Sequence, residues 1–175
     1  MVIETERLIL RRFMSTDYDD LFEFLFQLEN DEFEGYPGIT YENGKEHLAY
    51  RIDSQDFWAI ALKDTGKVIG NIYCGTRDFD AAEVGFIINR NYQGRGYAGE
   101  ALSAVIRNRF MSGTHRIYAE CDPRNISSWK LLEKVGMKRE AFFRKNIYFH
   151  KDNDGNPIWK DTYVYALLNT KEICL

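Results

Sequence analysis

The stretch from Asn89 to Ala98, NRNYQGRGYA, constrains this chain more than any other part of it. An apolar run, 84–88, leads into the stretch, and a segment with helical spacing, 100–111, leaves it. A strand that turns through glycines into a helix commonly binds phosphate. Glycine lets the backbone approach a ligand, and the first helical N–H groups have no partners within the helix. The helix dipole and the Arg95 guanidinium add positive charge there, although a tight turn that needs glycine only for positive φ is the alternative.

The composition is that of a folded globular chain. With 175 residues, of which 45% are hydrophobic, and without a linker or repeat, we expect a single domain over 1–175. No apolar run reaches the ~20 residues that span a bilayer, and the N-terminus has no signal-peptide pattern, so no membrane association is expected. Cys74, Cys121 and Cys174 are widely separated, which favours reduced thiols, no metal site and a cytoplasmic protein.

Charge is distributed unevenly along the chain, whose formal net charge is -4. Residues 1–60 hold 14 acidic and 5 basic residues, whereas residues 90–145 hold 12 basic and 5 acidic residues. The asymmetry favours an anionic ligand on the second half and a cationic one near the first, with chance and solubility as the competing explanation. The overall acidity argues against nucleic acid as a partner.

The apolar patterns predict a mixed α/β sheet in one domain. Strands are expected at 2–13, 57–62, 68–74, 82–89, 115–121, 137–149 and 159–168, and helices at 15–28, 45–52, 98–111 and 127–135. The breaker-rich segment 30–44 has the character of a long loop that covers a site. Core packing is expected for Trp58 and Trp159.

Gly94, Gly96 and Gly99 match G-x-G-x-x-G, the fingerprint of dinucleotide-binding domains. Glu120 follows about 20 residues later, as that fold requires. Against this reading, polar or aromatic residues at 89–93 separate the strand from the first glycine, and few residues remain to complete a doubly wound domain. A dinucleotide-binding oxidoreductase is therefore kept as an alternative.

The same stretch resembles the pyrophosphate-binding motif of the GNAT N-acetyltransferases. That motif asks for Gln or Arg, two residues, Gly, one residue, and then Gly or Ala. Gln93, Gly96 and Ala98 meet it. The segment 125–137 is similar to the family's Asn-containing helix that ends in Gly-Phe, with Met137 in place of Phe.

Two further segments, 6–11 and 161–168, resemble the branch of the family that acetylates ribosomal-protein N-termini on alanine or serine. The resemblance covers nearly the whole chain. It implies a largely antiparallel sheet of six to seven strands, about four flanking helices and two splayed central strands. It also implies acetyl transfer from acetyl-CoA to an amine, and it leaves formation of a homodimer open.

The resemblance implies three kinds of contact with acetyl-CoA. Backbone N–H groups of 94–98 hold the pyrophosphate, the edge of the strand at 86–88 pairs with the pantetheine amides, and the Asn125 side chain reaches the cofactor arm. The expected cofactor contacts are Phe86, Ile87, Ile88, Gln93, Gly94, Arg95, Gly96, Tyr97, Ala98, Asn125 and Ser128.

The acceptor amine must lose a proton before it can attack the thioester. An alkyl ammonium has a pKa near ~10.4 and an α-amino group about 7.7–8.0, so the former needs more help at neutral pH. Glu83, on the strand that leads to the cofactor, is the first candidate base and Glu120 the second. For both, the alternative is a solvated strand residue.

Many relatives protonate the departing thiolate with a tyrosine of the second helix, but the corresponding residue here is Leu132. Ser128 is the substitute that we consider, with a plain helix N-terminal serine as the alternative. A route through an acylated Cys121 is disfavoured because the sequence suggests no neighbouring histidine.

The acceptor is expected to be a peptide or protein N-terminus, or else a small polyamine or aminoglycoside-type amine. Tyr36, in the 30–44 loop, and Glu120 are the expected acceptor-side residues. The absence of the tyrosine also motivates a second hypothesis, in which the chain is a non-catalytic sensor that binds acyl-CoA without transferring its acyl group.

Overall fold

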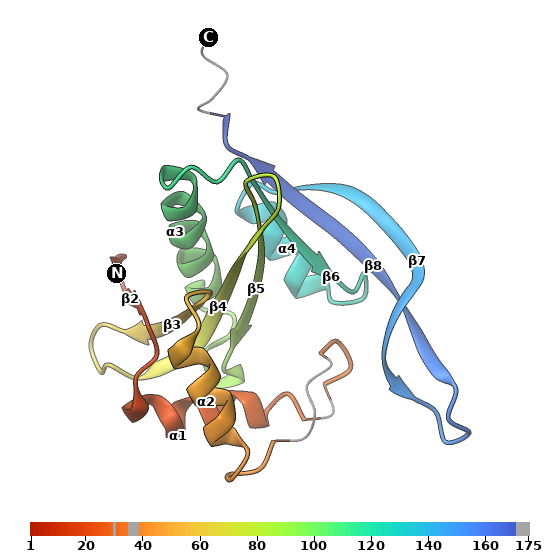
Figure 1. Ribbon diagram of the computed structural model, residues 1–175, viewed down its shortest axis with the longest axis horizontal. Helices are drawn as coiled ribbons and strands as arrows, with labels where there is room; N and C mark the ends of the chain where they lie inside the picture. Colours follow the sequence, from red (N-terminus) through yellow and green to blue (C-terminus); the bar gives the residue numbers. More distant parts are fainter. Residues whose placement is uncertain (30, 35–38, 171–175) are drawn as a thin grey trace.

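The computed structural model describes residues 1–29, 31–34 and 39–170, which form a mixed sheet covered by helices (Figure 1). The strands are β1 (Ile3–Glu4), β2 (Leu8–Arg11), β3 (Phe57–Leu62), β4 (Val68–Arg77), β5 (Ala81–Ile88), β6 (Arg116–Cys121), β7 (Lys138–Lys151) and β8 (Pro157–Leu168). Their order in the sheet is β1-β2-β3-β4-β5-β6-β8-β7. The expected first strand is broken into β1 and β2, so the sheet has eight strands rather than six or seven.

Within the described residues, four α-helices and two short 3₁₀ helices connect the strands, which agrees with the expected number of helices. The helices are α1 (Tyr18–Phe26), α2 (Gly44–Asp53), α3 (Tyr97–Met111) and α4 (Ile126–Lys134), and the turns are η1 (Ser15–Asp17) and η2 (Arg90–Tyr92). Helices α1 and α2 cover one face of the sheet, and α3 and α4 cover the other (Figure 1).

The central strand β3 explains this layering because its side chains alternate between the two faces. Trp58 and Ile60 belong to the apolar cluster under α3, whereas Phe57 and Ala59 belong to the cluster under α1 and α2. All six residues of β3 are buried, so this strand is covered on both faces. The expected core position of Trp58 is confirmed, with 3% of its surface exposed.

The topology excludes the dinucleotide-binding alternative. A doubly wound domain needs parallel strands, but among the described strands only the β5–β6 contact is parallel. The β4–β5 pair is an antiparallel hairpin that leads directly into the glycine stretch. The fingerprint match at Gly94, Gly96 and Gly99 is therefore coincidental.

The outer parts of β7 and β8, residues 144–159, project beyond the body of the domain as a two-stranded arm (Figure 1). Trp159 lies on this arm and is 50% exposed, so its predicted core position is wrong. Its ring instead meets Tyr148 edge-on, with centroids 5.3 Å apart. The sequence pattern of an arm strand resembles that of a core strand, because the aromatic residues pair across the two strands.

None of the helices among the described residues is long and apolar enough to cross a membrane. No group of three or more His, Cys, Asp or Glu side chains among them is arranged to hold a metal ion.

Candidate active site

Strands β5 and β6 separate halfway along their length. They pair in parallel only at Ala81–Arg116, Ala82–Ile117 and Glu83–Tyr118. Beyond Glu83, β5 continues to pair with β4 on its other side, and β6 continues to pair with β8. The edge of β5 that faces β6 is therefore left without a strand partner from residue 84 onward, which confirms the two splayed central strands.

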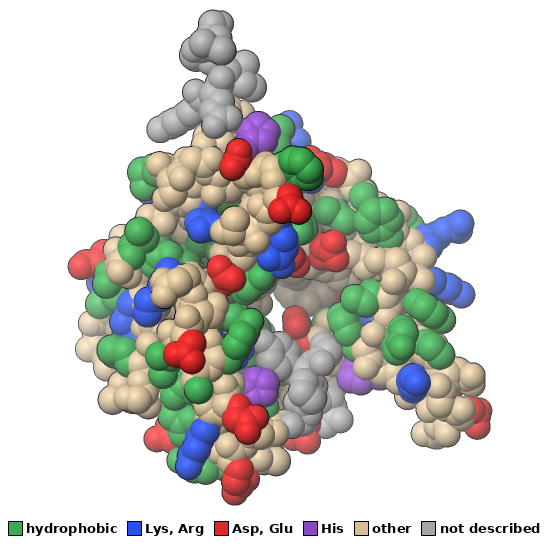
Figure 2. Space-filling view, in the orientation of Figure 1, with side chains coloured by type: hydrophobic (Ala, Val, Ile, Leu, Met, Phe, Trp, Pro, Cys, Tyr) green, Lys and Arg blue, Asp and Glu red, His purple; other side chains and the backbone are tan. Residues whose placement is uncertain are grey.

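A cavity of about 310 Å³ occupies this opening. Figure 2 shows the surface hollowed between the body of the domain and the β7–β8 arm. The predicted residues that line the cavity are Glu83, Phe86, Ile87, Glu120, Asn125 and Ser128. The structure thus brings together the two candidate bases, the candidate acid and part of the predicted cofactor strand.

The remaining predicted cofactor residues continue from the end of β5 into α3. Gly94 and Gly96 have φ of 73° and 84°, a left-handed conformation that residues with a Cβ atom rarely adopt. Gly96 is the residue that precedes α3. No main-chain N–H of 94–98 donates a hydrogen bond to another residue in the described part of the chain. Five main-chain donors without a partner among the described residues therefore lie at the N-terminus of a helix, which is the kind of backbone that binds anions.

Positive charge is preserved around these donors. Arg95 is exposed and lies over the Tyr92 ring, 5.5 Å from its centroid, and it forms no ion pair with a described residue. Glu100, an acid in the first turn of α3, is neutralised by Arg7, whose Nη2 lies 2.7 Å from the carboxylate. The potential at the turn is therefore favourable for a phosphate group.

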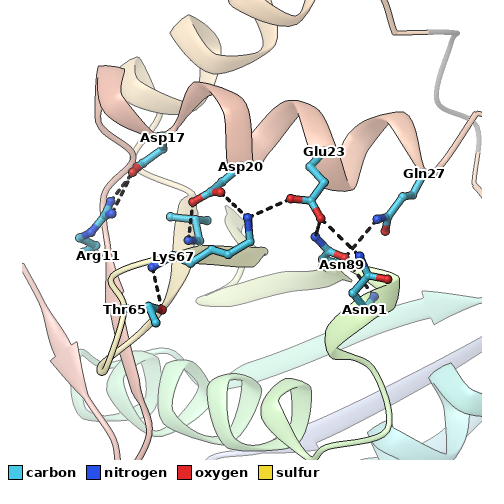
Figure 3. Close-up of polar contacts among 10 residues, drawn as sticks. Arg11, Asp17, Asp20, Glu23, Gln27, Thr65, Lys67, Asn89 and Asn91 are labelled. Atoms are coloured by element: carbon cyan, nitrogen blue, oxygen red, sulfur yellow. Dashed lines mark hydrogen bonds and ion pairs between the residues drawn. The ribbon is translucent and has the colours of Figure 1, made fainter.

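Buried polar contacts with α1 hold the turn in place (Figure 3). Asn89 is fully buried; its Nδ2 donates to Glu23 at 2.8 Å, and its Oδ1 accepts from Gln27 Nε2 at 3.1 Å. The same Oδ1 accepts the N–H of Asn91 at 3.0 Å, which fixes η2. Glu23 in turn accepts a hydrogen bond from Lys67 at 2.9 Å. The segment between β5 and the glycines is thus part of the core structure rather than a free loop.

Gln93 belongs to the predicted motif, and its side chain acts locally. Its Nε2 donates to the Ile88 carbonyl at 2.9 Å and so closes the turn at the end of β5. Asn125 caps α4 in a similar way, because its Oδ1 accepts from the Ser128 N–H at 3.2 Å. Both side chains thus fix the local backbone, Gln93 at the end of β5 and Asn125 at the start of α4.

The two candidate bases differ in their surroundings. Glu83 forms an ion pair with Arg77 at 2.5 Å, and Arg77 also donates to the Tyr73 hydroxyl at 3.0 Å. Glu120 forms no ion pair within the described residues. Partial burial and the neighbouring Glu83 carboxylate raise the pKa of Glu120 above its usual range. Glu120 is therefore the better proton acceptor of the two.

Cys121 also lines the cavity, but its thiol is poorly suited to nucleophilic attack. Burial raises its pKa to about 11, although contact with Ser128 opposes the shift. We expect Cys121→Ala to retain acetyl transfer within about threefold of the wild type, because the thiol stays neutral near pH 7. Steady-state rates of the two proteins would check this, and loss of turnover with intact folding would instead indicate an acylated cysteine.

Sequence reasoning missed several side chains of the cavity, namely Glu34, Tyr73 and Lys160. Tyr73 pairs with Gly85 across the β4–β5 hairpin, so the strand register could have revealed it. Glu34 and Lys160 reach the cavity only through long-range packing, and no local pattern marks them. Tyr36, the predicted acceptor-side residue, lies outside the described residues.

Comparison with known proteins agrees with this geometry. Residues 7–138 match the acetyltransferase (GNAT) domain family. An uncharacterised N-acetyltransferase, YnaD of Bacillus subtilis (strain 168), is 34% identical over 96% of this chain and 97% of its own. The [ribosomal protein uS5]-alanine N-acetyltransferase of Escherichia coli (strain K12) is 29% identical over 94% of this chain and 89% of its own.

A crystal structure of a GNAT-family acetyltransferase from Bacillus anthracis superposes with a TM-score of 0.87, at 29% identity over 98% of this chain and all of that one. The fold and the opening between β5 and β6 define a domain of the acyltransferase class. The chain belongs to the acetyltransferase (GNAT) family. Acetyltransferases with this fold use acetyl-CoA as the acetyl donor.

Proposed function

We propose that this chain transfers the acetyl group of acetyl-CoA to a primary amine by direct attack in a ternary complex, with a peptide or protein N-terminus as the preferred acceptor. The observation that carries the proposal is that the unpaired edge of β5 is followed in the chain by five main-chain N–H groups, 94–98, that have no partner among the described residues. An extended ligand with amides at one end and a diphosphate at the other matches this arrangement.

Each part of the site has a distinct task in this proposal. The N–H groups of 94–98 and Arg95 bind the diphosphate, and the edge of β5 at 86–88 pairs with the pantetheine amides. When bound, acetyl-CoA supplies an acetyl group on a good leaving sulfur. Asn125 contacts the cofactor arm, and the Ser128 hydroxyl, which lines the same cavity, protonates the departing sulfur.

The acceptor is inferred from chemistry and from relatives. Carboxylates outnumber basic side chains along the described lining of the cavity, which favours a cationic acceptor. The E. coli relative carries the name of an alanine N-acetyltransferase of ribosomal protein uS5. An α-amino group, with a pKa of about 7.7–8.0, also needs less help with deprotonation than a lysine side chain does.

Mass spectrometry of reactions with acetyl-CoA tests the proposal directly. Matched panels of peptides, polyamines and aminoglycosides would be compared under identical conditions. We expect a mass gain of one acetyl group on the N-termini of peptides and stoichiometric release of thiol. Absence of both with every amine in the panels would contradict the proposal.

A non-catalytic acyl-CoA sensor is the second candidate, because Leu132 lines the cavity where many relatives carry a tyrosine. The sensor would bind acetyl-CoA tightly and release no thiol. We expect turnover in the wild type and a rate at least about tenfold lower in Ser128→Ala. Detectable turnover excludes the strict form of the sensor.

A further inference from the structure

Residues 31–34 follow α1 in the chain and reach the cavity. Phe33 and Glu34 both line the cavity. The segment is attached to the far side of the opening, because Arg124 pairs with the Glu32 carboxylate at 3.2 Å and Lys160 Nζ donates to the Glu32 carbonyl. Residues 31–34 are therefore fixed at the cavity by contacts with Arg124 and with Lys160 of β8.

Lys160 is the main attachment. It belongs to β8, is only 8% exposed, and its Nζ lies 5.9 Å from the centroids of both the Phe33 and Phe149 rings. Its ammonium is also 3.8 Å from Asp122. A buried lysine needs such partners, so the contact with Glu32 contributes to the fold and to the placement of Glu34.

The charged side chains that line the cavity are Glu34, Glu83, Glu120, Asp122, Lys160 and Asp161. Two of these carboxylates are balanced by ion pairs, Glu83 with Arg77 and Asp122 with Arg124 at 2.7 Å. Asp161 accepts only the uncharged main-chain N–H of Lys145, at 2.8 Å. Glu34, Glu120 and Asp161 form no ion pair with a described residue.

Glu34 differs from Glu120 in its burial. Burial, followed by the neighbouring Asp31 carboxylate, raises the pKa of Glu34 to about 7. A base is most effective when its pKa lies near the working pH, because it is then both available and strong enough to hold the proton. Proton transfer to Glu83, by contrast, would break the ion pair with Arg77.

We propose that Glu34 is a catalytic residue that takes the proton of the acceptor ammonium, and that Lys160 is a positioning residue that holds Glu34 at the cavity. The inference rests on the proposed function. An N–H bond of the ammonium breaks as an O–H bond forms on Glu34. The freed lone pair forms the N–C bond to the acetyl carbon, and the C–S bond breaks with its electron pair on sulfur. The Ser128 hydroxyl gives its proton to that sulfur and regains one from the nitrogen, which loses its second proton.

The test compares Glu34→Gln with the wild type and with Glu29→Gln, which removes an exposed carboxylate from the same connection. At saturating acetyl-CoA and acceptor peptide, we expect kcat of Glu34→Gln to fall by about 100-fold at pH 7. The wild-type and Glu29→Gln profiles of kcat should rise with pH through an apparent pKa near 7, and this ascending limb should be lost in Glu34→Gln. In Lys160→Met, which displaces Glu34 but keeps its carboxylate, kcat should fall less than in Glu34→Gln and the ascending limb should remain.

A fall of less than about tenfold in Glu34→Gln, or an unchanged ascending limb, would overturn the inference. Such a result with an active wild type would leave the proposed function intact. A wild type that acetylates nothing would instead contradict the proposed function itself. Glu34→Asp keeps the carboxylate and should recover part of the lost rate if proton transfer is the role of Glu34.

A second readout needs no acetyl-CoA. Because the folded pKa of Glu34 lies above its ordinary value, the folded state holds this proton more tightly, and the stability of the wild type falls as pH rises from about 4.5 to about 7. Glu34→Gln has no carboxyl group at this position, so its stability does not decrease in this way as pH rises. We expect its Tm to exceed that of the wild type by a few degrees at pH 8 and to match it at pH 4. Equal Tm values at both pH values would contradict the burial of Glu34 on which the inference depends.

Discussion

Replacing Gly96 by valine is expected to weaken acetyl-CoA binding by about 100-fold, as two charge-assisted hydrogen bonds of roughly 1.5 kcal/mol each are lost. Gly96 has φ of 84° and precedes α3, so a β-branched side chain would force the backbone out of its left-handed conformation. The N–H groups of 94–98 would then no longer converge on one diphosphate. Isothermal titration calorimetry of the variant with acetyl-CoA would measure the change.

Gly113→Val is the matched control. Gly113 has φ of 94° with no atom within 4 Å of an added Cβ, and it lies at the other end of α3. Both variants should lose about 1–2 kcal/mol of unfolding free energy from backbone strain, but only Gly96→Val should lose affinity. Wild-type affinity in Gly96→Val would show that the coenzyme does not use this turn.

Asn89→Leu should lower the unfolding free energy by about 3 kcal/mol, since the partly buried groups that Asn89 contacts lose their partner. Leucine has a similar size, but Glu23 and Gln27 would each lose a hydrogen bond at a fully buried position. Because Asn89 fixes η2, we also expect the Kd for acetyl-CoA to rise by about tenfold. Urea unfolding and calorimetry would measure the two effects.

The pH dependence of the stability loss in Asn89→Leu shows how much of it comes from the hydrogen bond to the Glu23 carboxylate. Hydrogen bonds from Asn89 and then Lys67 hold the pKa of Glu23 below its ordinary value of 4.5. A lowered pKa contributes stability above pH 4.5 that disappears as pH falls. The difference in unfolding free energy between the wild type and Asn89→Leu should therefore become smaller below pH 4.5. Asn91→Ala is the control, because Asn91 is exposed and lies two residues away. Its unfolding free energy should change by less than about 0.5 kcal/mol at any pH. A loss as large as that of Asn89→Leu would contradict the role of Asn89.

The glycine stretch and the cofactor strand could be predicted because their chemistry is local. Positive φ at Gly94 and Gly96 follows from residue type and turn context. The alternation of β5, with Val84 and Ile88 in the core, follows from its period of two. The splay after Glu83 is not a local property, and it was expected only through the resemblance to a family.

The acceptor side was harder to predict because distant contacts create it. Glu34 looks like an ordinary loop acid in sequence, and the segment that carries it is held by a hydrogen bond from Lys160, far along the chain in β8, to the Glu32 carbonyl. Asn89 sits in a polar run whose buried character comes from contacts with α1. For Trp159 the prediction failed in the other direction, since a residue expected in the core is exposed. An aromatic strand pattern does not reveal whether a helix covers that strand.

A crystal structure of the protein with acetyl-CoA would test the central claim most directly. We predict that the diphosphate accepts hydrogen bonds from the main-chain N–H groups of 94–98, and that the pantetheine arm lies along β5 with the acetyl carbon in the cavity beside Glu34 and Ser128. A diphosphate bound at any other place, or a pantetheine arm outside the opening between β5 and β6, would contradict the account.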